Sequence, residues 1–518
     1  MRPKPQAMAS TEVRKIKRAL ISVYYKDNLE PVIHALAKRG VEFVSTGGTQ
    51  DFIKKLGYEV IPVESLTGYP EIFGGRVKTL HPAIFGGILY RRSHGQDVAE
   101  AEAHQITGID LVIVDLYPFE ETVSKGEDHA SIIEKIDIGG ISLIRAAAKN
   151  FADALIVSSR SQYSELLDLV NSGGGETTLA DRYRFAASAF ATTSHYDTAI
   201  FNYFNQGAGL VTFRKSVQDG RVLRYGENPH QKAVFFGRLE DLFEQLNGKE
   251  LSYNNLVDVD AGVALVEEFN QDTAFVIIKH TNACGAATGI TVKESYLKAL
   301  QADPVSAFGG ILVTNKTVDE SAAQEINKLF FEILVAPDFD QSALSLLQTK
   351  KNRIILKQKA KLAQEKHFKT LLNGVIEQDA DRWTDTRDEL KVVTQKAPSA
   401  DQVEALLFAS KICKHTKSNT IVLANQGQLL ASGVGQTSRV DALKQAIEKA
   451  KQFGMDVAGA AMASDAFFPF PDCVEIAAGA GISSVIQPGG SVKDQDSIDA
   501  CNRTGLAMVF TGRRHFRH

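Results

Sequence analysis

The chain has 518 residues, with 58 Lys and Arg against 62 Asp and Glu, so its formal net charge is −4. This balance excludes nucleic-acid binding through a generally basic surface, although a local anion site stays possible. Hydrophobic residues make up 44% and charged residues 23%, which is typical of a globular protein. No apolar stretch is long enough to predict a transmembrane helix, so we expect no membrane partner.

The first 18 residues are basic but lack the apolar core of a signal peptide, and we expect a disordered leader over 1–18. The cysteines are scattered, without a CxxC pair or zinc-ribbon spacing, at Cys284, Cys413, Cys473 and Cys501. Such spacing favours a reducing, cytoplasmic location over a disulfide framework. We therefore predict no metal site.

Residues 19–210 alternate strand and helix patterns. Ala19–Tyr25, Val41–Ser45 and the strongly apolar Asp110–Leu116 predict strands, and Leu29–Arg39 predicts a helix that stops at a glycine. Strands separated by helices predict an α/β domain with a parallel sheet covered on both faces. The window Leu179–Gln206 contains neither Gly nor Pro and predicts a connecting helix.

A domain boundary is predicted at Gln206–Leu210, which leaves residues 211–518 as a second α/β part. Its clearest strand is Ala274–Lys279. Thr420–Ala424 and Leu429–Val434 predict a hairpin. The weakly patterned stretch around 350–390 is expected to divide this part into two subdomains. A strand, a polar loop and a helix recur in both halves, which hints at an internal duplication.

Glycine-rich motifs in the first domain predict a phosphate site. Ser45–Thr49 (STGGT) joins a strand to a helix, so its backbone N–H groups and hydroxyls suit an anion. The alternative is an ordinary turn with Thr49 as the helix N-cap. Gly74–Pro82 (GGRVKTLHP) adds Arg76 and Lys78, which could bind phosphate or donate a proton, or could be ordinary solvated surface residues.

Two further motifs stand where a parallel sheet places its ligand crevice. Asp115 and Tyr117 follow the most apolar strand, at its carboxyl end. Asp137 precedes a predicted helix that carries Lys149. Each also has a structural interpretation, because Pro118 could simply terminate the strand and a lone lysine is usually exposed.

In the second part, Lys279 and His280 directly follow the buried strand. A histidine there can act as a general base, and a neighbouring ammonium group stabilises negative charge. The alternative is a structural histidine. Further polar loops are Arg224–Gln231, Lys414–Asn419 and Gly433–Arg439. No zinc-deaminase signature and no P-loop occur.

Together these motifs resemble one family. STGGT, GGRVKTLHP, LYPF, IDIGG, LIRAAAKN, RYGENPHQ, IKH, SNT, GVGQTSR, SDAFFPF and RRHF stand here in the order found in the bifunctional purine biosynthesis enzymes that combine AICAR transformylase with IMP cyclohydrolase. The resemblance spans about Ala19 to His518. It implies a methylglyoxal-synthase-like cyclohydrolase domain over 19–210. It also implies a transformylase part over 211–518, made of two cytidine-deaminase-like subdomains without zinc.

The resemblance also implies a reaction pair. A formyl group would pass from the cosubstrate 10-formyltetrahydrofolate to AICAR, and formyl-AICAR would close to IMP with loss of water. A homodimer is implied, with small-molecule partners and no nucleic acid or membrane. The family's ring-closing residues correspond here to Lys78, Tyr117, Asp137 and Lys149, with Lys149 as the main proton donor and acceptor. Its nucleotide-binding positions correspond to Lys26, Thr46, Gly47, Gly48, Thr49, Arg76, Val77, Thr79, Asp115 and Ile138.

For formyl transfer, the resemblance implies His280 as general base, Lys279 as transition-state stabiliser and Asn419 as a hydrogen-bond donor. AICAR-binding positions correspond to Arg224, Tyr225, Gly309, Glu332, Arg439, Phe467 and Arg514, and folate-side positions to Val440, Asp472, Ser491 and Val492. One departure is that the family's SVSDKT reads SVYYKD here, so two small polar positions are Tyr24 and Tyr25.

Two alternatives remain from the sequence. One is a methylglyoxal-synthase-like lyase acting on a triose phosphate, which would leave the second part without a role. The other is a nucleotide-sensing protein that binds purine monophosphates without turnover.

Overall fold

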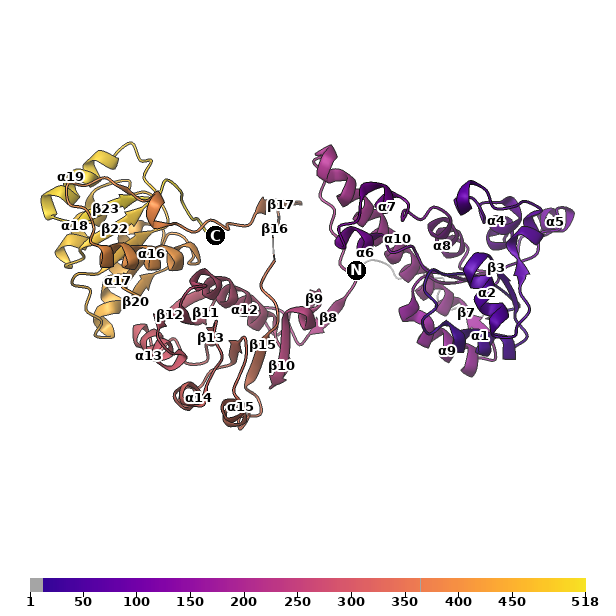
Figure 1. Cartoon of the computed structure of the whole chain (residues 1–518), viewed down its shortest axis with the longest axis horizontal. Coiled ribbons are helices and arrows are strands. Elements are labelled where there is room, and N and C mark those ends of the chain that lie inside the picture. The colour runs from indigo at the N-terminus through magenta and orange to yellow at the C-terminus, as the bar shows by residue number, and fades with distance from the viewer. Residues whose placement is uncertain (1–12, 364) are drawn as a thin grey trace. The chain divides into compact units, whose positions relative to one another are not determined.

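The computed structural model describes residues 13–363 and 365–518 and divides into two units, with the boundary between Gln218 and Asp219 (Figure 1). This boundary lies beyond the predicted Gln206–Leu210, whereas helix α10 (Leu179–Ala208) ends within that window. A capping box at Thr178 and Asp181 starts this helix, and Gly209 in a left-handed conformation ends it.

Unit 1 is built on a five-stranded sheet in the order β4-β3-β2-β5-β6. All of its pairings are parallel, as predicted. The strand bounds are β2 Arg18–Ser22, β3 Glu42–Ser45, β4 Ile61–Pro62, β5 Leu111–Val114 and β6 Leu155–Val157. Leu20 and Val112 pack on one face, and Ile21 and Ile113 on the other. Successive side chains point to opposite faces of the sheet. Because both faces are buried, the strands read as continuous apolar runs in the sequence.

Helices cover both faces of this sheet. The helices α1 and α9 pack on one face, and α4, α8 and α10 on the other. The helix bounds are α1 Leu29–Lys38, α2 Gly47–Lys55, α3 Val63–Thr67, α4 Pro82–Leu89, α5 Gly95–Ala103, α6 Phe119–Ser124, α7 His129–Ile133, α8 Gly139–Lys149 and α9 Tyr163–Ser172.

The predicted leader needs a correction. Strand β1 (Val13–Lys15) pairs antiparallel with β7 (Glu176–Thr178), so the backbone of 13–15 has ladder partners and is ordered. Residues 1–12 of that prediction lie outside the described residues.

Unit 2 contains a twelve-stranded mixed sheet in the order β10-β15-β14-β13-β11-β12-β20-β19-β21-β22-β23-β18. The two halves of the sheet meet at a single antiparallel bridge between Ala287 and Gln428. The strand bounds are β10 Phe243–Asn247, β11 Thr273–Lys279, β12 Asn282–Gly289, β13 Ile311–Thr314, β14 Ile333–Ala336, β15 Ile354–Gln358, β18 Lys391–Val392, β19 Ile421–Asn425, β20 Gln428–Gly433, β21 Ala461–Ser464, β22 Ser484–Gln487 and β23 Ala507–Phe510.

The two halves of this sheet share one topology. In each, a hairpin (β11–β12, β19–β20) is followed by an antiparallel neighbour (β13, β21), two parallel strands (β14–β15, β22–β23) and an antiparallel edge strand (β10, β18). This repetition agrees with the internal duplication hinted at by the sequence. It also confirms the α/β fold class.

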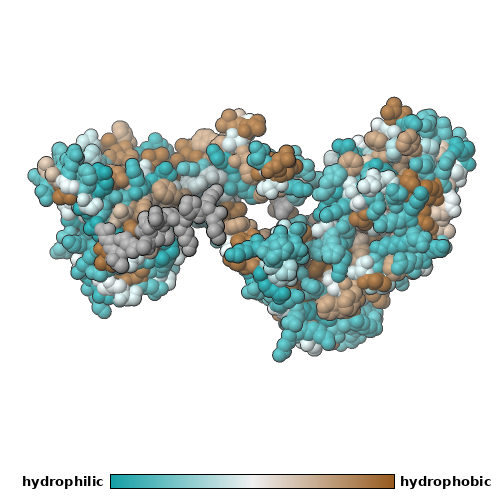
Figure 2. Space-filling view, turned by 180° about the vertical axis from the view of Figure 1, so that it is seen from behind, coloured by the Kyte–Doolittle hydropathy of each residue, from teal (hydrophilic) through white to brown (hydrophobic). Residues whose placement is uncertain are grey.

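The helices of unit 2 are α11 Leu239–Leu242, α12 Tyr253–Val266, α13 Val292–Ala302, α14 Glu320–Ile326, α15 Gln341–Leu347, α16 Ala400–Lys414, α17 Arg439–Gln452, α18 Asp472–Gly479 and α19 Asp494–Thr504. Two separate hairpins, β8–β9 (Gly220–Leu223, Ala233–Phe236) and β16–β17 (Lys366–Leu371, Gly374–Asp379), were not predicted. Apolar patches interrupt the polar surface (Figure 2), and Leu372 and Ile376 of the second hairpin region are among the exposed apolar residues. Across the described residues, no helix is long and apolar enough to cross a membrane.

Candidate functional site

A cavity of about 630 Å³ opens at the carboxyl ends of β2, β3 and β5 in unit 1. The predicted residues that line it are Lys26, Thr46, Gly47, Gly48, Thr49, Arg76, Lys78, Thr79, Asp115, Tyr117, Asp137 and Ile138. They come from five separate segments, which the parallel sheet gathers because its strands all end at the same edge.

Two helices begin at the wall of this cavity, and the first backbone N–H groups of a helix have no partner within the helix. Helix α2 begins at Gly47 and α8 at Gly139, and both glycines line the cavity wall. A helix N-terminus attracts anions through these groups and the helix dipole. The predicted Thr49 N-cap is wrong, because Thr46 occupies the N-cap position. The Thr49 hydroxyl instead donates to the Val23 carbonyl at 3.0 Å and thereby fixes the facing loop.

The cations of the GGRVKTLHP motif have acidic neighbours. Lys78 Nζ lies 2.8 Å from Glu71, and Arg76 forms an ion pair with Glu134. Both pairs are substantially exposed, so they orient the two side chains more than they stabilise the fold. Lys78 lines the cavity beside this carboxylate.

Tyr117 and Asp137 are two cavity residues whose pKa values are raised. Burial, and then the neighbouring charge of Asp137, raises the pKa of Tyr117. Burial also raises the pKa of Asp137, although hydrogen bonds from the backbone N–H groups of Gly140 and Tyr117 act to lower it. The Asp137 carboxylate accepts from Gly140 N–H at 2.6 Å, and a Cβ at Gly140 would stand 2.5 Å from its other oxygen. Only glycine therefore lets the carboxylate sit against the start of α8.

Asp115 organises the loop that follows β2. Its carboxylate accepts from the backbone N–H of Tyr24 and from that of Tyr25, the latter at 3.1 Å. The Tyr24 ring lies edge-on to the Tyr117 ring, with centroids 5.6 Å apart. Lys26 donates to backbone carbonyls of the same loop. Tyr24 thus forms an aromatic wall where the family motif has a small polar residue.

Two predicted residues of the first site are not brought to the cavity. Lys149 is the last residue of α8, an eleven-residue helix whose first residues line the cavity. At 1.5 Å per residue the helix carries it roughly 15 Å away, to an exposed position. Lys149 is thus not among the residues that line this cavity, and its role in ring closure stays a prediction. Val77 pairs with Ile72 in an isolated bridge instead of lining the cavity.

In unit 2, Lys279 and His280 stand at the end of β11. The Lys279 ammonium donates to the Phe308 carbonyl at 2.8 Å, and His280 is exposed. His280 and Thr281 both adopt left-handed backbone conformations, with φ of 51° and 66°. Such conformations are costly for non-glycine residues and cluster at functional sites. A hydrogen bond of 2.7 Å from Thr281 N–H to Asp258 holds this turn.

Asn419 reaches the same region from the second half of the sheet. Asn282, directly after the turn, accepts from Lys417 N–H at 3.0 Å across 135 residues of sequence. The Asn419 side-chain amide donates to the carbonyl of Gln436 at 2.9 Å, and its backbone N–H bonds the same carbonyl at 3.2 Å. The structure thus brings the IKH and SNT motifs together at the seam between the two halves.

The predicted AICAR-binding residues of unit 2 stand on several separate segments, and one of them, Gly309, adjoins Lys279. Gly309 is left-handed, and a Cβ there would stand 3.4 Å from Lys279 Nζ. Glu332 accepts from Asn255 at 3.0 Å, and Arg439 bonds Asp465 at 3.0 Å. The guanidinium of Arg224 lies over the Tyr225 ring. Phe467 and Arg514 are exposed.

The predicted folate-side residues all belong to the second half of unit 2. Val440 is in the first turn of α17, and Asp472 is the first residue of α18. Ser491 and Val492 follow β22, and Val492 is fully exposed. Among the described residues, no cluster of three His, Cys, Asp or Glu side chains could hold a metal ion.

Comparison with known proteins identifies the family. The family model for the AICARFT/IMPCHase bienzyme matches residues 147–449, and the model for the MGS-like domain matches residues 28–142. The bifunctional purine biosynthesis protein PurH of Bacteroides thetaiotaomicron is 59% identical over 98% of this chain and 100% of its own length. The PurH protein of Aquifex aeolicus is 47% identical over 97% of this chain and 100% of its own length.

This chain belongs to the AICARFT/IMPCHase bienzyme family. The MGS-like match covers most of the cavity residues, which confirms the predicted parallel-sheet domain.

Sequence reasoning missed several contributors to the sites of this bienzyme. Glu71 and Glu134, which pair with the two cations, carry no motif signal, since a lone glutamate in a loop or short helix is common. Asn282 was missed although it adjoins IKH, because its role depends on a partner that is far away in the sequence.

Proposed function

We propose that this chain catalyses two consecutive reactions: formyl transfer from 10-formyltetrahydrofolate to AICAR in unit 2, and closure of formyl-AICAR to IMP in unit 1. The observation that carries the proposal is the convergence of the family's phosphate and ring-closing motifs on one cavity of about 630 Å³, in a chain that matches the bienzyme family over nearly its full length.

For ring closure, the carboxamide nitrogen must attack the formyl carbon, and the formyl oxygen must take up protons and leave as water. The Lys78 ammonium is a donor for that oxygen. The raised pKa of Tyr117 keeps its phenol protonated at neutral pH, so it can donate as well. Asp137 is suited to accept the proton that the nitrogen loses. The N–H groups at the starts of α2 and α8 would bind the phosphate.

Among the residues that would bind this nucleotide, we keep Lys26, Thr46, Arg76 and Thr79 as direct contacts, because they line the cavity. Asp115 acts by shaping the loop that carries Lys26. The role of Lys149 as main proton donor and acceptor stays a prediction from the family resemblance, since Lys149 does not line this cavity.

For formyl transfer, the amine of AICAR attacks the formyl carbon of the folate, and the tetrahydrofolate nitrogen leaves. His280, exposed at the end of β11, would take the proton from the attacking amine. The Lys279 ammonium would stabilise the oxyanion that forms on the formyl oxygen. Asn419 would orient the substrate from the other side of the seam. Arg224, Tyr225, Gly309, Glu332, Arg439, Phe467 and Arg514 would hold AICAR, and Val440, Asp472, Ser491 and Val492 the folate.

We further propose that the chain acts as a cytoplasmic homodimer. Four buried, unpaired thiols suit a reducing compartment, and burial raises the pKa of Cys473 and of Cys501 to about 12. The exposure of the unit 2 candidates fits a site that a second copy completes.

The test is an assay of the purified chain with AICAR and 10-formyltetrahydrofolate. We expect tetrahydrofolate and IMP to form in equal amounts. Absence of both products, with purine monophosphate binding intact, would favour a sensor. Production of methylglyoxal from a triose phosphate would instead favour a lyase.

A further inference from the structure

The C-terminal tail of unit 2 follows β23 without regular secondary structure and is held by a few specific contacts. The backbone N–H of His515 donates to the Asp465 carbonyl at 3.0 Å. Ser418 N–H donates to the Arg517 carbonyl at 2.9 Å, and Arg517 N–H donates to the Ser418 hydroxyl at 3.0 Å. The tail therefore lies directly against the residue that precedes Asn419 and against the partner of Arg439.

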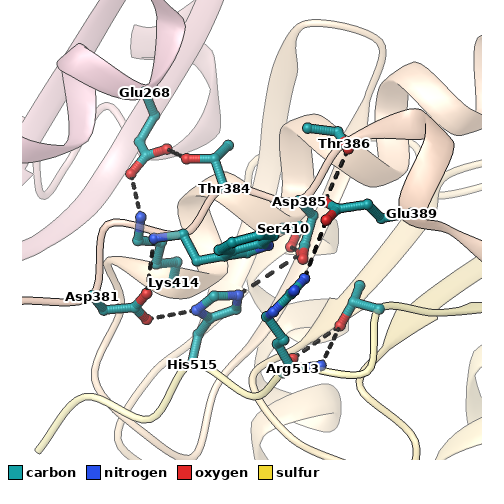
Figure 3. A network of polar contacts seen from close by, with 12 residues as sticks. Glu268, Asp381, Thr384, Asp385, Thr386, Glu389, Ser410, Lys414, Arg513 and His515 are labelled. Carbon is teal, nitrogen blue, oxygen red and sulfur yellow. Dashed lines mark hydrogen bonds and ion pairs between the residues drawn. The ribbon is translucent and has the colours of Figure 1, made fainter.

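Within this tail, His515 is the buried residue, only 7% exposed, while Arg514 and Phe516 on either side are exposed. Its Nδ1 lies 2.6 Å from Asp381, and its Nε2 lies 3.9 Å from Asp385 (Figure 3). Both aspartates belong to the segment between β17 and β18. Asp385 is itself buried and accepts a 2.6 Å hydrogen bond from Ser410 on α16.

The charges around His515 favour its protonated form. Burial alone would lower the pKa of this histidine, but the two carboxylates outweigh burial and raise it to about 9. The other charged groups of the network are already paired: Lys414 with Glu268 at 2.7 Å, and Arg513 with Glu389 at 3.3 Å (Figure 3). The Arg513 guanidinium also lies 3.4 Å from the centroid of the Trp383 ring. Asp381 and Asp385 are thus the acceptors that anchor the tail.

Anchoring His515 has a consequence for its neighbours. With His515 turned inward, the Arg514 guanidinium lies 4.6 Å from the Phe516 ring, and that of Arg439 lies 5.8 Å from the same ring. Two of the proposed AICAR contacts, Arg514 and Arg439, therefore flank one aromatic side chain. Release of His515 would let Arg514 and Phe516 move away from Arg439 together.

We propose that His515 is a positioning residue for formyl transfer, whose side chain, held by Asp381 and Asp385, fixes the C-terminal tail so that Arg514 and Phe516 lie beside Arg439. The inference rests on the proposed transfer function of unit 2. It assigns no proton transfer to His515 itself.

The first experiment compares His515→Gln with the wild type and with His367→Gln, a control at an exposed histidine of β16. If the tail is correctly placed in only about a tenth of the variant molecules, the KM for AICAR rises about tenfold, with a smaller change in kcat. His367→Gln should leave KM unchanged. An unchanged KM for AICAR in His515→Gln, or a rise confined to the folate, would overturn the proposal.

A second readout does not depend on catalysis. Trp383, the only tryptophan, lies under Arg513 of the tail and reports tail docking by its fluorescence. The ion pairs of His515 with Asp381 and Asp385 need the protonated histidine. They are therefore present below the raised pKa of His515 and are lost as pH rises through about 9. We expect a fluorescence change near that pH in the wild type, its absence in His515→Gln, and a parallel rise in KM for AICAR in the wild type alone.

Asp381→Asn keeps the test decisive should His515→Gln fold poorly. It should move fluorescence and KM in the same direction as His515→Gln but by less, since Asp385 remains, and the double variant should be no worse than His515→Gln alone. If the effects of the two substitutions on KM added fully, His515 and Asp381 would not act through one shared contact. If the wild type transfers no formyl group yet shows the fluorescence transition, the proposed function fails while the tail anchor stands.

Discussion

The two units build their candidate sites in different ways. In unit 1, Thr46, Thr49, Thr79, Asp115 and Asp137 are all buried around one cavity. In unit 2, His280, Phe467 and Arg514 are exposed. One hydrogen bond joins Lys417 to Asn282 between the two halves, and another joins Arg517 of the tail to Ser418. A parallel sheet creates a crevice by itself, because its strands end at one edge. A sheet made of two similar halves depends on long-range contacts to align its functional groups.

The largest expected effect separates the units by chemistry. His280→Ala should lower formyl transfer by about 10²–10⁴-fold, the usual contribution of a general base, because the variant lacks the imidazole proposed to take the amine proton. Cyclisation of supplied formyl-AICAR should be unchanged. Initial rates of both reactions test this, with His367→Ala as the control. Loss of both activities would mean that the units are not independent.

A second prediction concerns the buried ion pairs that Glu268 forms with Lys414 and His415 in unit 2. Burial would raise the pKa of Glu268, but hydrogen bonds from His415, Lys414 and Thr384 lower it from 4.5 to about 2. A carboxylate with a lowered pKa stabilises the fold above its unfolded value and loses that contribution as pH falls from about 4.5 toward 2. We expect a loss on the order of 3 kcal/mol in the free energy of unfolding.

Urea unfolding followed by Trp383 fluorescence measures this loss in unit 2. Glu268→Gln should be less stable than the wild type at pH 7, because Lys414 would be left buried without its partner. Its stability should also change less between pH 5 and pH 3. Equal pH dependence in the two proteins would show that Glu268 is not the group responsible.

A third prediction sharpens the account of the cavity. Gly140→Ala places a Cβ 2.5 Å from an Asp137 oxygen, so the carboxylate or the start of α8 must shift. We expect a cost of about 1–3 kcal/mol in unit 1 and a loss of cyclisation, with formyl transfer retained. Gly95→Ala is the matched control, since a Cβ at that helix start meets nothing within 4 Å. Normal cyclisation in Gly140→Ala would remove Asp137 from the scheme.

These cases show what could be predicted from sequence. The parallel sheet and its cavity followed from Leu20, Val44 and Val112, whose apolar runs mark buried parallel strands, and from motifs placed at strand ends. The position of Lys149 at the far end of α8 could not be predicted, because a motif match does not show how far a helix carries a residue from the cavity. The Asp381–His515 contact spans 134 residues, and no local pattern announces it.

The smallest expected effect concerns the residue that departs from the family motif. Tyr24→Phe keeps the ring that packs edge-on against Tyr117, so cyclisation should change by less than about threefold, in line with the roughly 0.5 kcal/mol typical of a weak contact. Tyr24→Ser removes the ring and should raise the KM for formyl-AICAR further. Steady-state cyclisation kinetics of both variants measure the difference. Equal KM values for formyl-AICAR in the two variants would mean that the Tyr24 ring does not contribute to binding.

The central claim is that separate sites in one chain perform consecutive reactions. Product analysis of Lys78→Met, supplied with AICAR and 10-formyltetrahydrofolate, tests it most directly. The variant lacks the ammonium at the cavity of unit 1 and keeps every proposed transfer residue of unit 2. We predict that formyl-AICAR accumulates, one molecule for each AICAR consumed, with IMP formation lowered about 10²–10³-fold. IMP at the wild-type rate, or no formyl transfer, would contradict the account.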